Sequence, residues 1–99
     1  MDIEKITELL QALSDPVRLQ IIYLLGEKGS MNVNAISANF NISRPAISHH
    51  LKVLKSSKIV KATKKGQEVE YEFERELLVA CLRDLAEELE ACCPRGEKQ

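Results

Sequence analysis

The three cysteines are the residues of this chain best suited to bind a soft metal ion or to be oxidised. Cys81 and Cys92 share one face of a predicted C-terminal helix but lie about 16 Å apart along it, so they cannot share an ion within one chain. If two such helices pack antiparallel about a two-fold axis, Cys81 of one copy faces Cys92 and Cys93 of the other, which predicts two thiolate clusters. The alternative is that Cys81 fills a small core position and that Cys92 and Cys93 are thiols at a frayed helix end.

The two histidines do not predict a metal or catalytic centre. His49 and His50 are neighbours on a predicted helix, so their side chains point about 100° apart and hold one metal poorly. Ser48 and His49 cannot form a nucleophile and base pair for the same reason, and the sequence offers no acid to orient the histidine. We therefore expect a protein that is not an enzyme.

The charges are distributed unevenly, although the net charge is only −1. From Arg44 to Gln67 there are seven basic residues and no Asp or Glu, whereas from Glu68 to Gln99 ten acidic residues accompany four basic ones. A basic patch on an otherwise acidic molecule favours binding to the phosphates of a DNA duplex, because the attraction is local. The alternative is a solvated, lysine-rich face.

Hydrophobic spacing predicts one mainly helical domain over residues 1–99, with a small β-hairpin. Asp15 is suited to cap the second helix, and Pro16 to occupy its first position. The expected helices cover residues 3–13, 17–25, 33–40, 44–56 and 76–93, with Gly26 and Gly29 ending the second, Pro94 stopping the last, and residues 94–99 disordered.

The middle of the chain predicts a winged helix-turn-helix. Residues 33–56 contain two short helices joined by a tight turn, and Ser43 caps the second of them. Residues 58–74 form the expected β-hairpin wing with a basic tip. The side chains expected to cover the core are Ile47, Leu51 and Leu54 from the helix and Val69, Tyr71 and Phe73 from the wing.

The second helix of a helix-turn-helix enters the major groove with its first residues against base edges. Arg44 occupies that end and can donate to two acceptors of a guanine, while the remaining contacts are expected to go mainly to phosphate. Double-stranded DNA is thus the expected partner, with no cofactor required for binding it. The candidate DNA-binding residues are Ser43, Arg44, Pro45, Ile47, Ser48, His49, Lys52, Lys55, Lys64, Lys65 and Gln67.

Three motifs in a fixed order carry a family resemblance: LSDPVRL at residues 13–19, SRPAISHHLKVL at residues 43–54 and GQEVEY at residues 66–71. In this order they resemble the ArsR/SmtB family of metal-responsive repressors, across nearly the whole chain. In that family the first and last helices form the dimer interface, and effector binding lowers operator affinity. The resemblance implies a homodimer joined through residues 3–13 and 76–93 that binds a palindromic operator.

The resemblance also bears on the effector. Family members with a thiolate site before the turn carry Cys-x-Cys there, but the matching stretch here is Asn32-Val33-Asn34. Similar proteins with a cysteine pair at the end of the last helix are sensors of trivalent arsenic. The resemblance therefore implies trivalent arsenic, or another soft ion, as the effector at Cys81, Cys92 and Cys93. The zinc site between the last helices is also absent, because its positions align with Arg75, Leu77, Glu88 and Ala91.

Two other functions remain open. The same DNA-binding repressor can be switched by oxidation of its thiols. A winged-helix interaction module without an effector is the other alternative, but it leaves the acid-free stretch of residues 44–67 without a purpose. No stretch is apolar enough for a membrane span and the first residues lack the pattern of a signal peptide, so a cytoplasmic protein without a membrane partner is expected.

Overall fold

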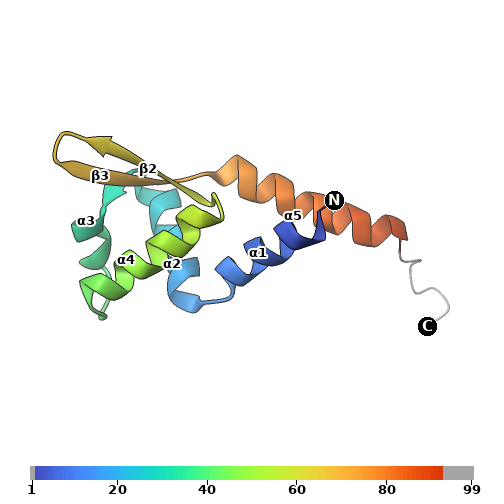
Figure 1. Cartoon of the computed structure of the whole chain (residues 1–99), viewed down its shortest axis with the longest axis horizontal. Coiled ribbons are helices and arrows are strands. Elements are labelled where there is room, and N and C mark those ends of the chain that lie inside the picture. Colours follow the sequence, from blue (N-terminus) through green and yellow to red (C-terminus); the bar gives the residue numbers. More distant parts are fainter. Residues whose placement is uncertain (1, 93–99) are drawn as a thin grey trace.

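The computed structural model describes residues 2–92 of the 99-residue chain. Helices α1 and α5 lie at one end of an elongated molecule, and α3, α4 and the β-hairpin lie at the other (Figure 1). The molecule measures 57 × 26 × 24 Å along its principal axes. In chain order the elements are α1 (Ile3–Leu13), α2 (Pro16–Lys28), β1 (Met31–Asn32), α3 (Val33–Ser37), α4 (Arg44–Ser56), β2 (Val60–Lys65), β3 (Glu68–Phe73) and α5 (Arg75–Cys92).

Side-chain caps determine where the first four helices begin. At each start a polar side chain accepts a hydrogen bond from a backbone N–H group that has no partner within the helix. These bonds run from Glu4 to Asp2 (3.0 Å), from Val17 to Asp15 (2.8 Å), from Ala35 to Asn32 (2.8 Å) and from Ala46 to Ser43 (3.3 Å). The predicted starts of these four helices agree with the structure to within one residue, and two of the four caps, Asp15 and Ser43, were predicted from the sequence.

The ends of two helices differ from the prediction. Helix α2 runs through Gly26 to Lys28 and is capped by Gly29, whose φ of 85° lies in the left-handed region that glycine adopts readily. Helix α3 ends at Ser37 and not at residue 40. Beyond it the backbone bonds tighten to three-residue spacing, with the N–H of Asn39 donating to Ile36 and that of Phe40 to Ser37.

The three strands form an antiparallel sheet in the order β1-β3-β2. The two-residue strand β1, which the sequence did not predict, pairs Met31 with Tyr71. The hairpin pairs Lys65 with Glu68 across a two-residue turn that starts at Gly66, whose φ is 63°, as a type II′ turn requires. Val69 was expected to cover the core, but 38% of it is exposed because it lies near the tip; Tyr71 and Phe73 do pack against the core.

One hydrophobic core joins all the helices and the base of the wing. Its fully buried members come from α2, α3, α4 and the start of the wing at Ile59 and Val60, and Leu78 adds a contact from α5. No polar or charged side chain within residues 2–92 is buried. None of the helices in this part of the chain has both the length and the apolar character that a bilayer span needs.

Candidate nucleic-acid interface

Helix α4 is held against the rest of the domain by its apolar side. Ile47, Leu51 and Leu54 follow one another at helical spacing, and none of the three has any exposed surface. The prediction that Ile47 contacts DNA is therefore wrong, because a fully buried side chain cannot reach a ligand. Its role is to fix the orientation of α4 against the core.

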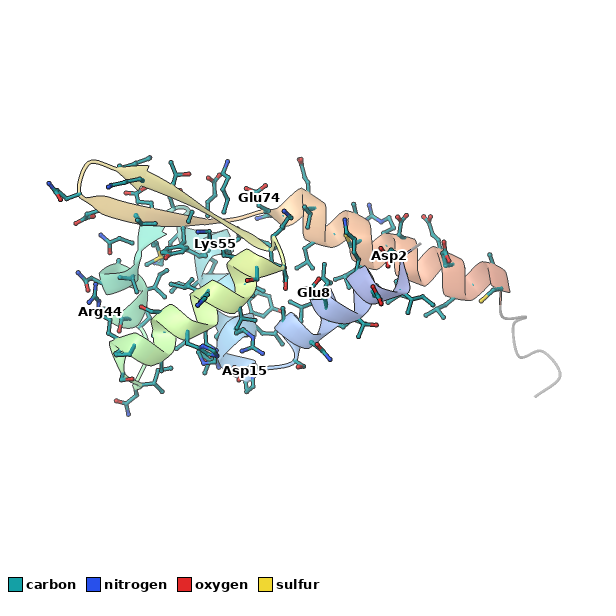
Figure 2. The ribbon with its side chains drawn as sticks, in the orientation of Figure 1. Asp2, Glu8, Asp15, Arg44, Lys55 and Glu74 are labelled. Atoms are coloured by element: carbon teal, nitrogen blue, oxygen red, sulfur yellow. The ribbon has the colours of Figure 1, made fainter. Side chains whose placement is uncertain are left out.

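The outward side of α4 is polar and basic. Arg44, Lys52 and Lys55 are exposed on this side, and Figure 2 marks Arg44 near the start of α4 and Lys55 near its end. No ion pair within residues 2–92 engages any of these three cations. Their charges are thus available to an anionic partner. The remaining exposed candidates of this helix are Pro45, Ser48 and His49.

Ser43 has a structural role at the start of α4. Its Oγ accepts from the backbone N–H of Ala46 at 3.3 Å and so caps the helix. The hydroxyl proton remains available as a donor, because a serine hydroxyl can donate and accept at the same time. A phosphate contact by Ser43 therefore stays a prediction beside its capping role.

Two lysines of the wing lie beside acidic side chains in the folded structure, although none is near them in the sequence of β2. Strand β3 places glutamates directly beside strand β2, so the acid-free stretch acquires acidic neighbours on folding. The Nζ of Lys65 lies 3.4 Å from Oε1 of Glu70, and the Nζ of Lys61 lies 3.9 Å from Glu72 and 3.8 Å from Glu74. Such exposed pairs stabilise little, but they reduce the positive potential of β2. Among residues 44–67, the exposed cations without an ion pair to any residue of 2–92 are therefore those of α4, Lys58 and Lys64, and the wing tip exposes Lys64, Lys65 and Gln67.

The side of α4 facing α2 carries an interaction that sequence reasoning missed. Nη1 of Arg18, on α2, lies 3.1 Å from Nδ1 of His50, which is half-buried, whereas the neighbouring His49 is exposed. The same guanidinium donates to the carbonyls of Ala12 and Gln11 at the end of α1. Residues 18 and 50 are 32 positions apart, so no local pattern reveals their contact.

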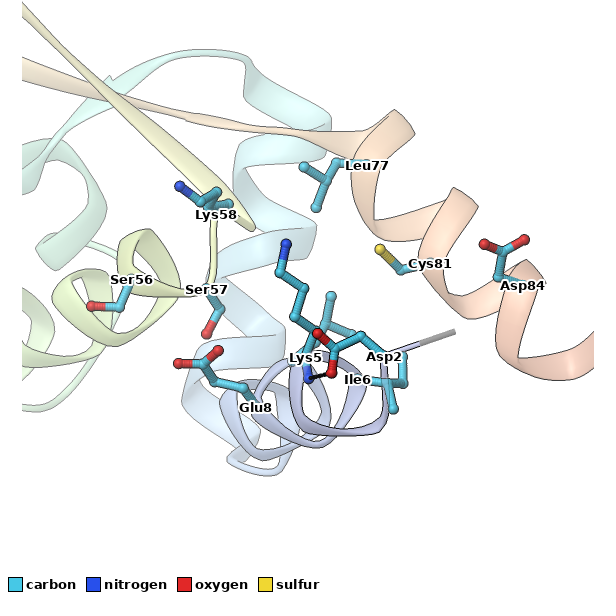
Figure 3. Close-up of a pocket in the computed structure, with 11 residues that line it drawn as sticks. Asp2, Lys5, Ile6, Glu8, Ser56, Ser57, Lys58, Leu77, Cys81 and Asp84 are labelled. Atoms are coloured by element: carbon cyan, nitrogen blue, oxygen red, sulfur yellow. Dashed lines mark hydrogen bonds between the residues drawn. The ribbon is translucent and has the colours of Figure 1, made fainter. Parts of the chain in front are cut away.

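The cysteines lie at the other end of the molecule. Cys81 is half-buried and lines a pocket of about 270 Å³ between α1, α5 and the end of α4. Figure 3 shows its thiol directed from α5 into this pocket. Cys92 is exposed in the last turn of α5, and Cys93 lies outside the described residues. Within residues 2–92 no three His, Cys, Asp or Glu side chains gather as a metal site would require, so one chain's described part does not form the proposed thiolate cluster.

Comparison with known proteins identifies related sequences. The family described as "Bacterial regulatory protein, arsR family" matches residues 15–62. An uncharacterized HTH-type transcriptional regulator of Methanocaldococcus jannaschii is 49% identical over 63 residues, which cover 64% of this chain and 71% of the relative. The arsenical resistance operon repressor of Staphylococcus xylosus is 33% identical over 78 residues, which cover 79% of this chain and 74% of the repressor.

Solved structures agree in fold. The crystal structure of an ArsR family transcriptional regulator superposes with a TM-score of 0.81 at 26% identity, covering 96% of this chain and 97% of that protein. The homodimeric winged helix-turn-helix DNA-binding domain of a Mycobacterium bovis protein superposes with a TM-score of 0.73 at 24% identity, covering 89% and 82%. The fold is therefore a winged helix-turn-helix, mainly helical with a small β-sheet.

Proposed function

The chain belongs to the ArsR family of bacterial regulatory proteins, and we propose that it binds a palindromic operator as a homodimer and represses transcription there. Its fold and its relatives are those of DNA-binding transcriptional regulators and not of enzymes.

The basic outward side of α4 carries this proposal. Arg44 stands in the first turn of an exposed helix, where it can donate two hydrogen bonds to one guanine in the major groove. Lys52 and Lys55 follow on the same side and contact phosphates on either side of the groove. Lys64 extends the basic surface to the wing tip, which reaches the neighbouring backbone. Arg44 thus reads the sequence, whereas the lysines hold the helix in place.

Apolar side chains exposed on α1 and α5 support the dimer. Leu89 is 53% exposed and Ile3 is 72% exposed, and both lie on the helices at the end of the molecule opposite the wing (Figure 1). A second copy related by a two-fold axis covers these side chains and presents a second α4 to the next half-site, about 34–36 Å away. The other exposed apolar side chains of this surface are Leu10, Leu77, Val79 and Leu82.

To test the proposal, the purified protein is used to select duplexes from a random library. Its affinity for the selected duplexes is then measured by fluorescence anisotropy at several salt concentrations. Arg44→Ala should cost about 1–3 kcal/mol of binding free energy and relax the preference at one base position. Lys52→Ala should weaken all duplexes alike and reduce the salt slope by about one. Lys28→Ala removes an exposed lysine of α2 and serves as the matched control. Failure of the unaltered protein to enrich any palindrome at low salt would contradict the proposal.

For the effector, we propose that trivalent arsenic binds the thiols and releases the dimer from DNA. The likeness to an arsenical resistance operon repressor supports the choice of ion. The Cys81 thiol opens into the pocket between α1 and α5, which are the proposed dimer helices. Because Cys81 and Cys92 are too far apart along one helix, the cluster has to combine thiols of two chains, Cys93 included. Binding there changes the spacing of the two α4 helices, with a coupling of about 1–3 kcal/mol.

Titration of arsenite into the operator complex tests this effector. Release is expected from the unaltered protein, whereas Cys92→Ser with Cys93→Ser, and separately Cys81→Ser, should stay bound. Equal release from all three proteins would exclude the thiols. Release by peroxide in the absence of arsenite, reversed by a dithiol, would favour the second candidate, a repressor switched by thiol oxidation.

A further inference from the structure

Arg18 joins three helices through one guanidinium group. From α2, its Nε donates to the carbonyl of Ala12 at 2.6 Å and its Nη2 to the carbonyl of Gln11 at 3.3 Å. Both carbonyls belong to the last turn of α1, and that of Gln11 also accepts from the backbone N–H of Ser14 at 3.2 Å and from its Oγ at 2.8 Å. The third nitrogen, Nη1, lies 3.1 Å from Nδ1 of His50 on α4. The end of α1 and the side of α4 are therefore connected through a single side chain.

The contact between Arg18 and His50 has a fixed direction. A guanidinium group carries only donors, so the contact is a hydrogen bond in the tautomer whose Nδ1 accepts. His50 is also half-buried and packed on the side of α4 that faces α2, away from the exposed Arg44 and Lys52. It is placed to orient α4 and not to touch DNA.

We propose that Arg18 is a positioning residue for DNA binding, which sets the angle of α4 against α1 by holding His50. This inference rests on the proposed function, in which α4 reads the operator and α1 lies at the dimer interface. The buried Ile47, Leu51 and Leu54 fix how α4 packs on the core. The planar fork of Arg18 has fixed donor directions, so it adds to this packing a directional link between α4 and the end of α1.

A double-mutant cycle on selected operator DNA tests this role. Arg18→Ala and His50→Leu should each weaken operator affinity about tenfold, and the double variant should be no weaker than the weaker single variant, because both remove the same link. His50→Asn keeps an acceptor close to the position of Nδ1 and should stay within about twofold of the unaltered protein. Binding to random duplex should change much less, since phosphate contacts tolerate a small change of angle.

Two further measurements distinguish a positioning role of Arg18 from a simple loss of folding stability. Circular dichroism and thermal unfolding show whether each variant is folded at the temperature of the binding assay. If Arg18→Ala fails to fold, Arg18→Lys replaces it; this variant keeps the charge but cannot span three acceptors, so it should also lose operator affinity.

The possible outcomes are distinct. Additive losses in the cycle would show that Arg18 and His50 act independently and would overturn the inference, as would unchanged operator affinity in variants with a lower unfolding temperature. Both results leave the proposed function intact. Failure of the unaltered protein to prefer any palindrome would instead overturn the proposed function.

Discussion

The side-chain amide of Asn32 donates to Oε1 of Glu68 over 2.7 Å and ties the start of α3 to the first residue of β3. Its Oδ1 at the same time accepts from the backbone N–H of Ala35 at 2.8 Å. One residue thus both caps α3 and anchors the wing. The family resemblance aligns residues 32–34 with a Cys-x-Cys site, and in the structure Asn32 of this stretch is a helix cap.

Asn32→Ala should lower the free energy of unfolding by about 1–2 kcal/mol, because it removes the cap and the link to Glu68 together. Urea denaturation followed by circular dichroism measures this loss. Asn32→Asp keeps the cap but places a second carboxylate against Glu68, so its stability should recover when Glu68→Gln is added. Unchanged stability of Asn32→Ala would show that the link contributes nothing.

Lys58→Gly should raise the free energy of unfolding by up to about 1 kcal/mol. Lys58 has a φ of 63°, in the position after the end of α4 that glycine usually occupies. The N–H of Ile59 donates to Leu54 and that of Lys58 to Lys55, which completes a Schellman motif despite the strained residue. Lys58→Ala, which loses the same charge but keeps the strain, is the control for thermal unfolding. If both variants are more stable than the unaltered protein, the gain comes from loss of the lysine charge and not from relief of backbone strain.

Gly26→Ala should stabilise the protein by about 0.5–1 kcal/mol, because glycine inside a helix costs conformational entropy. A Cβ atom at residue 26 would lie 3.6 Å from Cδ2 of Phe73 and 3.9 Å from Nη2 of Arg75, which are ordinary contacts. Gly29→Ala is the opposite case, since its φ of 85° strains any other residue, and this variant should be less stable. Equal effects of the two variants in urea denaturation would contradict the view that residue 26 is an ordinary helical position and that residue 29 needs a positive φ.

Asp15→Ala should lower the free energy of unfolding by about 1 kcal/mol near neutral pH, through loss of the α2 cap. Burial acts to raise the pKa of Asp15, but the backbone N–H groups of Arg18 and Val17 and the charges of His50 and Arg18 outweigh it and hold that pKa below 3.8. Because the folded state has the lower pKa, this stabilisation is present above pH 3.8 and is lost as the pH falls through the lowered value.

Denaturant titrations across this pH range should therefore show that the difference in free energy of unfolding between Asp15→Ala and the unaltered protein becomes smaller in acid. Asp15→Asn keeps a capping oxygen without the charge and should show less of this pH dependence. A gap that stays constant with pH would mean that the carboxylate charge plays no part.

Leu89→Asp should dissociate the proposed dimer, because it places a charge in the apolar surface of α5 at a cost of about 2 kcal/mol or more. Sedimentation velocity measures the mass at several concentrations. Tyr23→Asp is the matched control: Tyr23 is 73% exposed but lies on α2, outside the surface formed by α1 and α5, so this variant should remain dimeric. Dissociation of both variants, or of neither, would show that the interface lies elsewhere.

The helices were predictable where their signals are local. The ends of α1 and α4 follow from apolar spacing and from capping residues such as Ser43, and the structure has both helices at the predicted residues. The exposed positions of Arg44, Lys52 and Lys55 follow from the same spacing, since they lie opposite the apolar side of α4.

Features that depend on the folded arrangement were not predictable from the sequence. Strand β1 has only two residues and exists because β3 lies beside it. The pairing of Lys61 and Lys65 with glutamates of β3 depends on the register of the hairpin. The contact between Arg18 and His50 requires α2 and α4 to pack.

The molecule is elongated, with α1 and α5 at one end and α4 and the wing tip at the other (Figure 1). In the proposed dimer, a small tilt where the two copies meet is therefore magnified at the wing tips, where the pitch of the duplex fixes the distance between half-sites. A small ligand bound between α1 and α5 would thus shift both wing tips out of register with the DNA grooves without repacking the hydrophobic core.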